Sequence, residues 1–327
     1  VASGMPASSF VPLGRTGLWI TGLGFGCYRV HDSVDEHYDA LRMALESGCN
    51  LIDTSTNYGD GGSERLVGSV VHELGALHDS EAIVIVSKVG YLQGRNLADA
   101  LGRERRGAGY TDVVQYGEGF WHCIHPSFIE DQLSLSLDRL GQDSIDVYLL
   151  HNPEYFLSYL DKVDDPRSLA ERRDAFYERI RMAFECLEAL VAAGKIGSYG
   201  VSSNTFVVPS TAPNATSVAR MIEIAKAVGG EDHHFSTIQL PMNLYEMGAF
   251  LEDNNSGETT LAVANANQLA VLANRPLNAI VGGQLLRLSD FEVDVPEHPV
   301  PRLIGAVRKL EQEFDEGLAR VLAAQTD

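Results

Sequence analysis

Long apolar runs and basic residues are both scarce in this sequence of 327 residues. A membrane-spanning helix needs an unbroken run of about eighteen or more apolar residues, and no such run occurs, so we expect no membrane insertion. Only 25 Lys and Arg oppose 45 Asp and Glu, for a formal charge of −20. That surface would repel a phosphate backbone. We therefore expect no nucleic-acid partner, although a local positive pocket would still accept an anionic cofactor.

Cysteine is also scarce, and its four positions form no CxxC pair: Cys27, Cys49, Cys123 and Cys186. This pattern argues against a zinc site and against a disulfide framework. We expect no metal site and an intracellular, reducing compartment, with cytoplasm and an organelle such as a mitochondrion or chloroplast both open. The sequence has no signal-peptide pattern and starts with Val1. A cleaved transit peptide and a trimmed chain are both consistent with that start.

The remaining composition, with 45% hydrophobic and 21% charged residues, is that of an ordinary globular protein with a substantial core. Short apolar runs alternate with segments of helical periodicity. A Gly-punctuated hairpin is predicted from Phe10, leading into a buried strand near 23–26. Further strands are predicted at 50–53, 81–88, 146–150, 196–202, 235–240 and 269–276. Helices are predicted at 36–48, 63–74, 127–141, 167–193, 216–228 and 260–269.

These seven β-then-α units, with no obvious linker between them, indicate one α/β domain over residues 1–327 with a parallel sheet covered on both faces. An open doubly wound sheet and a closed (β/α)8 barrel both fit this order. Polar residues follow the carboxyl ends of many different strands, and a barrel would bring all those ends to one rim. We therefore favour the (β/α)8 TIM-type barrel.

Four of the rim residues form a set suited to proton transfer: Asp53, Tyr58, Lys88 and His151. A nearby ammonium would stabilise a phenolate and lower the pKa of the phenol, and a carboxylate would hold the lysine charged. A neutral imidazole would orient a substrate oxygen. Taken singly, each residue also has a structural interpretation, such as a turn cap, a loop aromatic, a partnered buried lysine or a core histidine. Their position after three consecutive strands favours function.

At these residues the chain resembles the aldo-keto reductase superfamily, over about residues 10–278. The matching motifs are PLGRTGLWITGLGFG, LIDTSTNYGDGGSERLVG, IVSKVG, SLDRLGQDSIDVYLLHNP, GKIGSYGVSSNT and IQLPMNLYE. The resemblance implies a (β/α)8 barrel with an N-terminal hairpin across its base. It also implies a catalytic tetrad of Asp53, Tyr58, Lys88 and His151, with Tyr58 as general acid in reduction and general base in oxidation.

The resemblance further implies a nicotinamide cofactor, NADP(H) or NAD(H). Gly24, Phe25 and Gly26 would line the approach to the nicotinamide. Its carboxamide would be held by residues after two later strands: Ser203 (or its neighbour Ser202), Asn204 and Gln239. The stretch Asn274, Arg275, Pro276, Leu277 stands where the family carries an aromatic ring followed by Ser-Pro-Leu. Asn274 would replace the stacking ring, and Arg275 would meet the pyrophosphate or form a surface salt bridge.

The family's last βα unit, which grips the adenosine, cannot be found, and an atypical segment over 283–327 takes its place. That segment includes a predicted amphipathic helix over 305–325. Two insertions, about 91–125 and 153–182, add length elsewhere. The first would either wall the substrate pocket or pack as a surface excursion. A seven-stranded barrel has an open seam. A longer parent protein, a second chain or C-terminal fragment, or an unusual closure by the final segment would explain it.

The sequence therefore predicts an NAD(P)(H)-dependent oxidoreductase that moves hydride between a nicotinamide and an aldehyde, ketone or sugar substrate. A weakly active or non-catalytic subunit of a larger assembly is the alternative, because the last unit and the stacking aromatic are both missing. Sequence alone leaves open the substrate, the choice between NADPH and NADH, and the direction of reaction.

Overall fold

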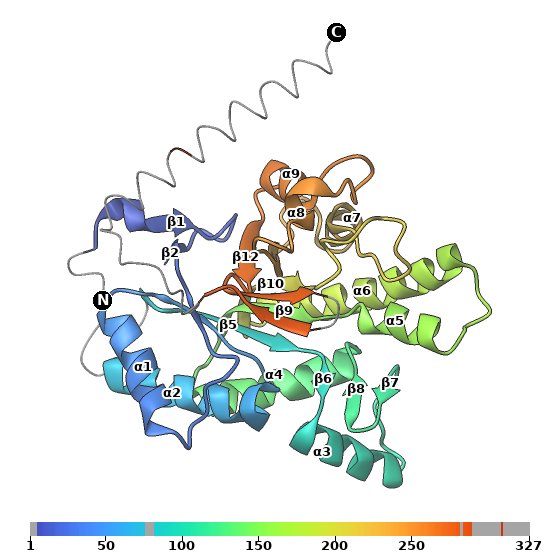
Figure 1. The fold of residues 1–327 in the computed structure, drawn as a ribbon. Coiled ribbons are helices and arrows are strands. Elements are labelled where there is room, and N and C mark those ends of the chain that lie inside the picture. The colour runs from blue at the N-terminus through green and yellow to red at the C-terminus, as the bar shows by residue number, and fades with distance from the viewer. Residues whose placement is uncertain (1–4, 76–81, 282–283, 290–308, 310–327) are drawn as a thin grey trace. The chain divides into compact units, whose positions relative to one another are not determined.

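The computed structural model of the chain describes residues 5–75, 82–281, 284–289 and 309. The chain divides into two units, Val1–Leu286 and Arg287–Asp327. Most of the second unit, including the predicted amphipathic helix apart from Lys309, lies outside the described residues. Figure 1 shows the helices and strands of the first unit.

A parallel sheet of seven strands forms the centre of this unit, in the order β12-β11-β10-β9-β5-β4-β3. All seven strands were predicted. They are β3 (Phe25–Gly26), β4 (Leu51–Asp53), β5 (Val84–Val89), β9 (Ile145–His151), β10 (Ile196–Ser202), β11 (Phe235–Pro241) and β12 (Ala270–Asn274). Strands β5 and β11 are buried along their whole length, which explains why they read as continuous apolar runs. Strand β3 differs from the prediction, because it has only two residues, half-buried and exposed.

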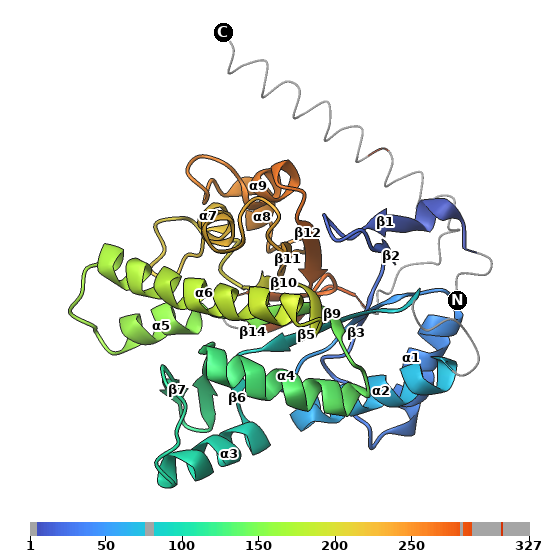
Figure 2. The same ribbon diagram turned by 180° about the vertical axis from the view of Figure 1, so that it is seen from behind.

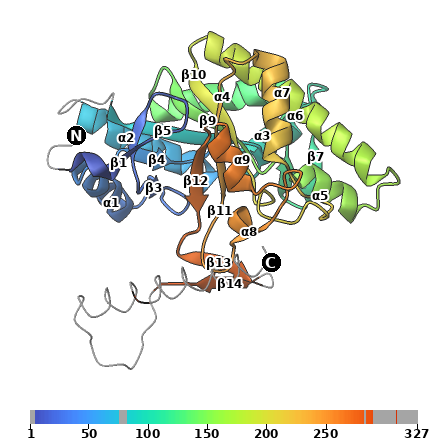
Figure 3. The ribbon, with the colours of Figure 1, turned by 90° about the horizontal axis from the view of Figure 1, so that it is seen from above.

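The predicted helices follow the strands and cover the outer face of the sheet (Figures 1 and 2). They are α1 (Asp35–Glu46), α2 (Gly62–Gly75), α4 (Pro126–Leu140), α6 (Leu169–Ala192), α7 (Val218–Gly229) and α9 (Thr260–Ala266). Helix α4 begins after a His125 cap with proline in its first turn and ends at Gly141, whose φ of 62° is left-handed. Helix α6 begins with a capping box of Ser168 and Glu171. Helices α6 and α7 pack side by side (Figure 3).

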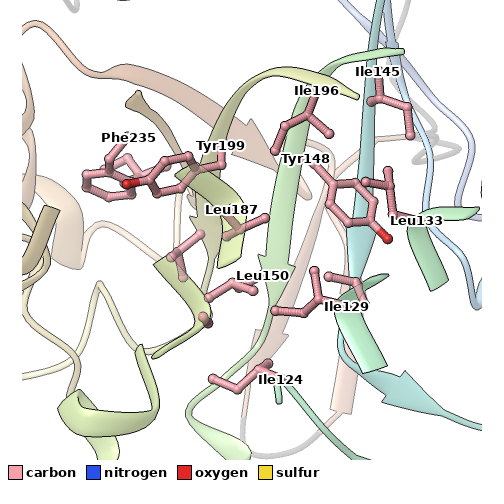
Figure 4. Packing of buried hydrophobic residues seen from close by; sticks show 14 of the residues in the cluster. Ile124, Ile129, Leu133, Ile145, Tyr148, Leu150, Leu187, Ile196, Tyr199 and Phe235 are labelled. Carbon is pink, nitrogen blue, oxygen red and sulfur yellow. The ribbon is translucent and has the colours of Figure 1, made fainter. Parts of the chain in front are cut away.

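Two apolar clusters hold these layers together. The larger one lies between the strands and the helices, and part of it, from Ile129 and Leu133 of α4 to Tyr199 and Phe235, is shown in Figure 4. The smaller one lies on the opposite, inner face and takes alternate residues of the strands, such as Val84 and Val86 or Val147 and Leu149. Because successive side chains of a strand point to opposite faces, one apolar run supplies both clusters.

The N-terminal hairpin closes the bottom of the inner cluster, as predicted. Strands β1 (Phe10–Pro12) and β2 (Trp19–Thr21) pair antiparallel, and Leu13 and Ile20 join the inner cluster. At the turn, Gly14 has a φ of 52°, and a Cβ there would lie 2.4 Å from the backbone nitrogen of Ala270. Only glycine permits this approach of the hairpin to the start of β12.

The sheet curls without closing. Among the described residues, β3 pairs only with β4, and β12 pairs only with β11. The curl brings distant strands together, since Gln239 of β11 donates a hydrogen bond to Asp53 of β4 at 3.0 Å although three strands separate them in the sheet. Over the described residues the architecture is therefore a (β/α)8-type barrel sheet of seven strands whose two edge strands do not pair with each other.

The insertions add structure at the carboxyl ends of the strands. The first holds β6 (Tyr91–Leu92), α3 (Gly94–Arg105), β7 (Val114–Gly117) and β8 (Phe120–His122), with a small sheet in the order β6-β8-β7. The second holds α5 (Tyr155–Lys162) and the start of α6. Apart from the start of α6, the sequence did not predict the elements of these insertions. It also did not predict η1 (Ala7–Ser9), η2 (Tyr58–Gly61), α8 (Gly248–Leu251) and the two-stranded sheet of β13 (Asn278–Val281) and β14 (Gln284–Arg287).

Within the described ranges, no helix is both long and apolar enough to span a membrane. The four cysteines are unpaired thiols; Cys27, Cys123 and Cys186 are buried and Cys49 is half-buried.

The packing of β10 against β11 makes a testable prediction at Gly200. A Cβ at this position would lie 1.9 Å from the carbonyl oxygen of Thr237, so Gly200→Ala has to force the two strands apart. We expect a loss of about 3 kcal/mol in the free energy of unfolding, measured by urea denaturation. Gly117→Ala, where nothing lies within 4 Å of the added Cβ, is the matched control. Equal stability of the two variants would contradict the packing of this strand pair.

Candidate active site

The four side chains predicted for proton transfer meet at the carboxyl ends of neighbouring strands. Asp53 ends β4, Lys88 is the penultimate residue of β5, and His151 ends β9. Tyr58 opens the 3-10 turn η2 that follows β4. Because β5 pairs with both β4 and β9, the three strand ends are adjacent. The turn then returns the phenol toward them.

Lys88 lies at the centre of the group and is fully buried. Its Nζ lies 2.8 Å and 2.9 Å from the two carboxylate oxygens of Asp53. It also donates to the carbonyl oxygen of Thr54 at 2.8 Å and to the Tyr58 hydroxyl at 3.4 Å. Burial opposes the charged form, but the Asp53 carboxylate and Tyr58 outweigh it and leave the pKa of Lys88 raised. The side chain is therefore an ammonium at neutral pH.

The pKa of the Tyr58 phenol differs from the prediction. Burial raises its pKa, and the Lys88 ammonium opposes that rise without overcoming it, so the pKa of Tyr58 ends above its ordinary value. The expected lowering by lysine is present as one contribution, but desolvation is larger. The sequence could not weigh the two, because the depth of the phenol depends on packing. Tyr58 is therefore a neutral acid at physiological pH.

Gln239 and Ser202 support Asp53 from across the barrel. Gln239 Nε2 donates to Asp53 Oδ1 at 3.0 Å, and Ser202 Oγ donates to Gln239 Oε1 at 2.9 Å. The chain of contacts runs from Ser202 through Gln239 and Asp53 to Lys88. Gln239 and Ser202 were predicted to lie on the rim, but the motif spacing did not show that they orient Asp53 by hydrogen bonds.

His151 is buried and is contacted on three sides. Its Nδ1 lies 3.1 Å from Ser55 Oγ, its ring packs against the Tyr91 ring with centroids 4.6 Å apart, and its carbonyl oxygen lies 2.7 Å from His122 Nε2. Burial, the Lys88 charge and His122 together hold the pKa of His151 well below its ordinary value. The imidazole is therefore neutral, as predicted.

The first insertion contributes directly to this environment. Tyr91 and His122 both come from it, and rings from the insertion and from α5 form one aromatic cluster made of Tyr91, Tyr116, Phe120, His122 and Tyr155. Asn152 extends the cluster by donating to the Tyr91 hydroxyl at 2.5 Å. The sequence showed that the insertion is rich in aromatics. It did not show which of them face His151.

The remaining predicted residues lie along the same rim. Gly26 pairs with Asp53 and Phe25 with Ile52, and Gly24 packs against Leu51. Ser203 points into a cluster of hydroxyl groups with Thr205 and Thr216. The backbone nitrogen of Asn204 donates to Glu154 Oε1 at 2.9 Å.

Arg275 forms an ion pair on this rim. Its Nη2 lies 2.6 Å from Glu246 Oε1, and its φ is 54°. The neighbouring Asn274 Oδ1 is buried without a hydrogen-bond partner among the described residues. Pro276 and Leu277 are exposed. The structure therefore shows the salt bridge that was one of the two expectations for Arg275, and the pyrophosphate contact stays a prediction.

No group of three or more His, Cys, Asp or Glu suited to a metal ion occurs in the part of the chain that the structure describes.

The protonation of Glu154 makes the stability of the fold depend on pH. The side chain is buried, one of its oxygens has no partner among the described residues, and burial raises its pKa to about 7. A carboxyl group with a raised pKa favours the fold in its protonated form, so its contribution is complete below its unfolded pKa near 4.5 and is lost as pH rises through about 7.

Glu154→Gln should be more stable than the wild type at pH 8, by up to about 3 kcal/mol, and equally stable at pH 4. The exposed Glu118→Gln is the control for urea melts at both pH values; a constant difference between Glu154→Gln and wild type would contradict this assignment.

Comparison with known proteins places this rim in context. A family model described as the aldo/keto reductase family matches residues 22–304. NADH-specific methylglyoxal reductase of Escherichia coli is 28% identical over 149 residues, covering 43% of this chain and 41% of that protein. Aldo-keto reductase YhdN of Bacillus subtilis is 24% identical over 318 residues, covering 93% and 75%. The chain spans less than half the length of several curated relatives that it matches.

A solved structure of similar fold is an aldo/keto reductase from Klebsiella pneumoniae in complex with NADP and acetate. Its TM-score is 0.51 at 22% identity, covering 82% of this chain and 68% of that one. The matched region contains every strand of the seven-stranded sheet and all four side chains that meet at its rim. The chain belongs to the aldo/keto reductase family.

Proposed function

We propose that this protein is an NAD(P)(H)-dependent oxidoreductase that transfers hydride between a nicotinamide and the carbonyl carbon of an aldehyde, ketone or sugar. One observation carries the proposal: a buried Lys88 ammonium is shared between the Asp53 carboxylate and the Tyr58 hydroxyl. A structural lysine needs only a counter-ion. The added contact with a phenol beside a neutral imidazole is what acid-base chemistry at a carbonyl oxygen requires.

In this proposal Tyr58 gives its proton to the substrate oxygen during reduction and takes it back during oxidation. The Lys88 ammonium, 4.9 Å from the centre of the phenol ring, stabilises the phenolate that forms. Asp53 keeps that ammonium charged and fixed in place. The His151 ring lies 5.9 Å from the Tyr58 ring, centroid to centroid, close enough for both to contact one substrate molecule.

The cofactor would lie along the rim beside these residues. When bound, a nicotinamide supplies or accepts the hydride. Gly26 leaves open space where a side chain would stand, which suits the close approach of a flat ring to the start of the rim. Asn274 Oδ1, buried and without a partner among the described residues, offers an acceptor for a carboxamide NH2. These features support Gly26 and Asn274 as contacts, and Gly24, Phe25 and Asn204 stay predictions.

Either cofactor form fits the proposal. One relative is named as NADH-specific and another as an NAD(P)H-dependent D-xylose reductase from Scheffersomyces stipitis, and the Klebsiella structure holds NADP. Arg275 would contact the pyrophosphate, which requires it to exchange Glu246 for phosphate oxygens. Small carbonyl compounds or sugars are the proposed substrates.

Replacing Tyr58 by Phe tests the proposal. The variant loses the proton donor but no proposed cofactor contact, so carbonyl reduction should fall by about 10²–10⁴-fold while the affinity for NADPH or NADH stays close to wild type. Reduction is followed by loss of the nicotinamide absorbance over a panel of aldehydes, ketones and aldoses, and affinity by the fluorescence of Trp19 and Trp121. Tyr28→Phe, an exposed phenol that packs edge-on against Tyr58, is the control. Unchanged turnover in Tyr58→Phe would overturn the assignment.

Lys88→Met tests the tuning of the phenol. Because Lys88 lowers the pKa that burial raises in Tyr58, its loss should move the pKa seen in the oxidation pH profile upward and reduce kcat at neutral pH. The measurement is kcat as a function of pH in the direction of alcohol oxidation. A profile that keeps its wild-type pKa would show that Lys88 serves the fold alone.

A further inference from the structure

Ser55 is a buried hydroxyl that neither the motif analysis nor the proposed mechanism uses. It lies two residues after Asp53, and its side chain is fully buried. Its Oγ lies 2.7 Å from Asn57 Oδ1, 3.1 Å from His151 Nδ1 and 3.4 Å from the carbonyl oxygen of Lys88. Three polar atoms therefore surround one hydroxyl group, which has a single proton to give.

Counting protons assigns the direction of each bond. Asn57 Oδ1 and the Lys88 carbonyl oxygen can only accept, and the amide of Asn57 is oriented by its Nδ2, which donates to Gln93 Oε1 at 3.3 Å. The Ser55 proton goes to Asn57 Oδ1, its shortest contact. The remaining lone pair of Ser55 then faces His151 Nδ1, and that nitrogen has to be the donor.

The tautomer of His151 follows from this direction. Burial and the nearby Lys88 charge keep the ring neutral, and a neutral imidazole carries one proton. If Nδ1 holds that proton, Nε2 is left as an acceptor. No hydrogen-bond partner of Nε2 occurs among the described residues. A bare carbonyl oxygen offers no proton to such a nitrogen, whereas a hydroxyl group does.

We propose that Ser55 is a positioning residue that sets the His151 tautomer, placing the proton on Nδ1 and leaving Nε2 to accept a hydrogen bond from a hydroxyl group of the substrate. The assignment of the tautomer stands on the contacts of Ser55 and on the neutrality of the buried ring, and the substrate class rests on the proposed function. Within that function, the favoured substrates are hydroxylated: an alcohol, or a carbonyl compound with a hydroxyl group on the neighbouring carbon, as in a sugar.

Nitrogen NMR of the protein labelled with ¹⁵N-histidine tests the tautomer without any turnover, because long-range proton–nitrogen correlations distinguish the two neutral forms. The His151 signals are identified by their absence from a His151→Asn variant. Wild type should show Nδ1 protonated. In Ser55→Ala the Nδ1 proton loses its acceptor, so the ring should change to the form protonated at Nε2, and Ser55→Thr, which restores a hydroxyl, should return the wild-type pattern.

Two further variants keep the test decisive if Ser55→Ala fails to fold. Ser55→Cys replaces the hydroxyl by a thiol, whose sulfur is only a weak acceptor, so the ring should again shift toward the form protonated at Nε2. Ser63→Ala removes another buried hydroxyl, bonded to Thr54 and to the Cys27 carbonyl, and should leave the tautomer unchanged.

Kinetics test the substrate class. Between 2-hydroxypropanal and propanal, which differ by the neighbouring hydroxyl, wild type should favour the hydroxylated aldehyde by about tenfold in kcat/KM, the value of one hydrogen bond, mainly through KM. Ser55→Ala should lose that preference.

Wild-type signals with Nε2 protonated, or a tautomer that does not respond to Ser55→Ala and Ser55→Cys, would overturn the inference. These outcomes are separate from failure of the proposed function. A protein without turnover that still shows the Nδ1 tautomer would contradict the function and leave the role of Ser55 intact. An active enzyme with Nε2 protonated would do the reverse.

Discussion

The burial of one positive charge constrains the whole rim of the barrel. A lysine ammonium removed from water is costly unless every proton has a partner, and Lys88 meets that demand with the Asp53 carboxylate, the Thr54 carbonyl and the Tyr58 hydroxyl. Asp53 in turn is fixed by Gln239 from the far side of the sheet. The curl of the sheet, the turn after β4 and the orientation of the phenol are therefore tied to the same charge.

Burial and the Lys88 charge together set the pKa values of Tyr58 and His151. Tyr58 and His151 are both neutral at physiological pH, for opposite reasons: burial raises the pKa of the phenol, while burial and the ammonium lower the pKa of the imidazole. Lys88 acts on both groups and pushes each pKa in the same direction, downward. Two neutral titratable groups therefore lie beside a single fixed cation at this rim.

Much of this architecture could be predicted from the sequence, because it depends on local patterns. Apolar runs gave the seven strands, and polar residues at their ends gave the rim. What could not be predicted depends on residues far apart in the chain. The contact of Gln239 with Asp53 requires the curl of the sheet, the ion pair of Arg275 with Glu246 joins two separate loops, and the net pKa of Tyr58 depends on how deeply the phenol is buried. The role of Ser55 could not be predicted, because a serine in a sequence does not show which side chains its hydroxyl contacts. The atypical segment from 290 onward, apart from Lys309, lies outside the described residues.

The first insertion contacts the site in two ways: the Tyr91 ring packs against the ring of His151, and His122 forms a hydrogen bond with the His151 carbonyl oxygen. A change in the insertion would therefore act on His151. The insertion therefore cannot be replaced independently of the site. A different segment in its place would remove the two contacts that orient His151. Changes in the exposed rim, such as around Leu244 or Leu277, are separated from that coupling. The insertion and the position of His151 are thus coupled.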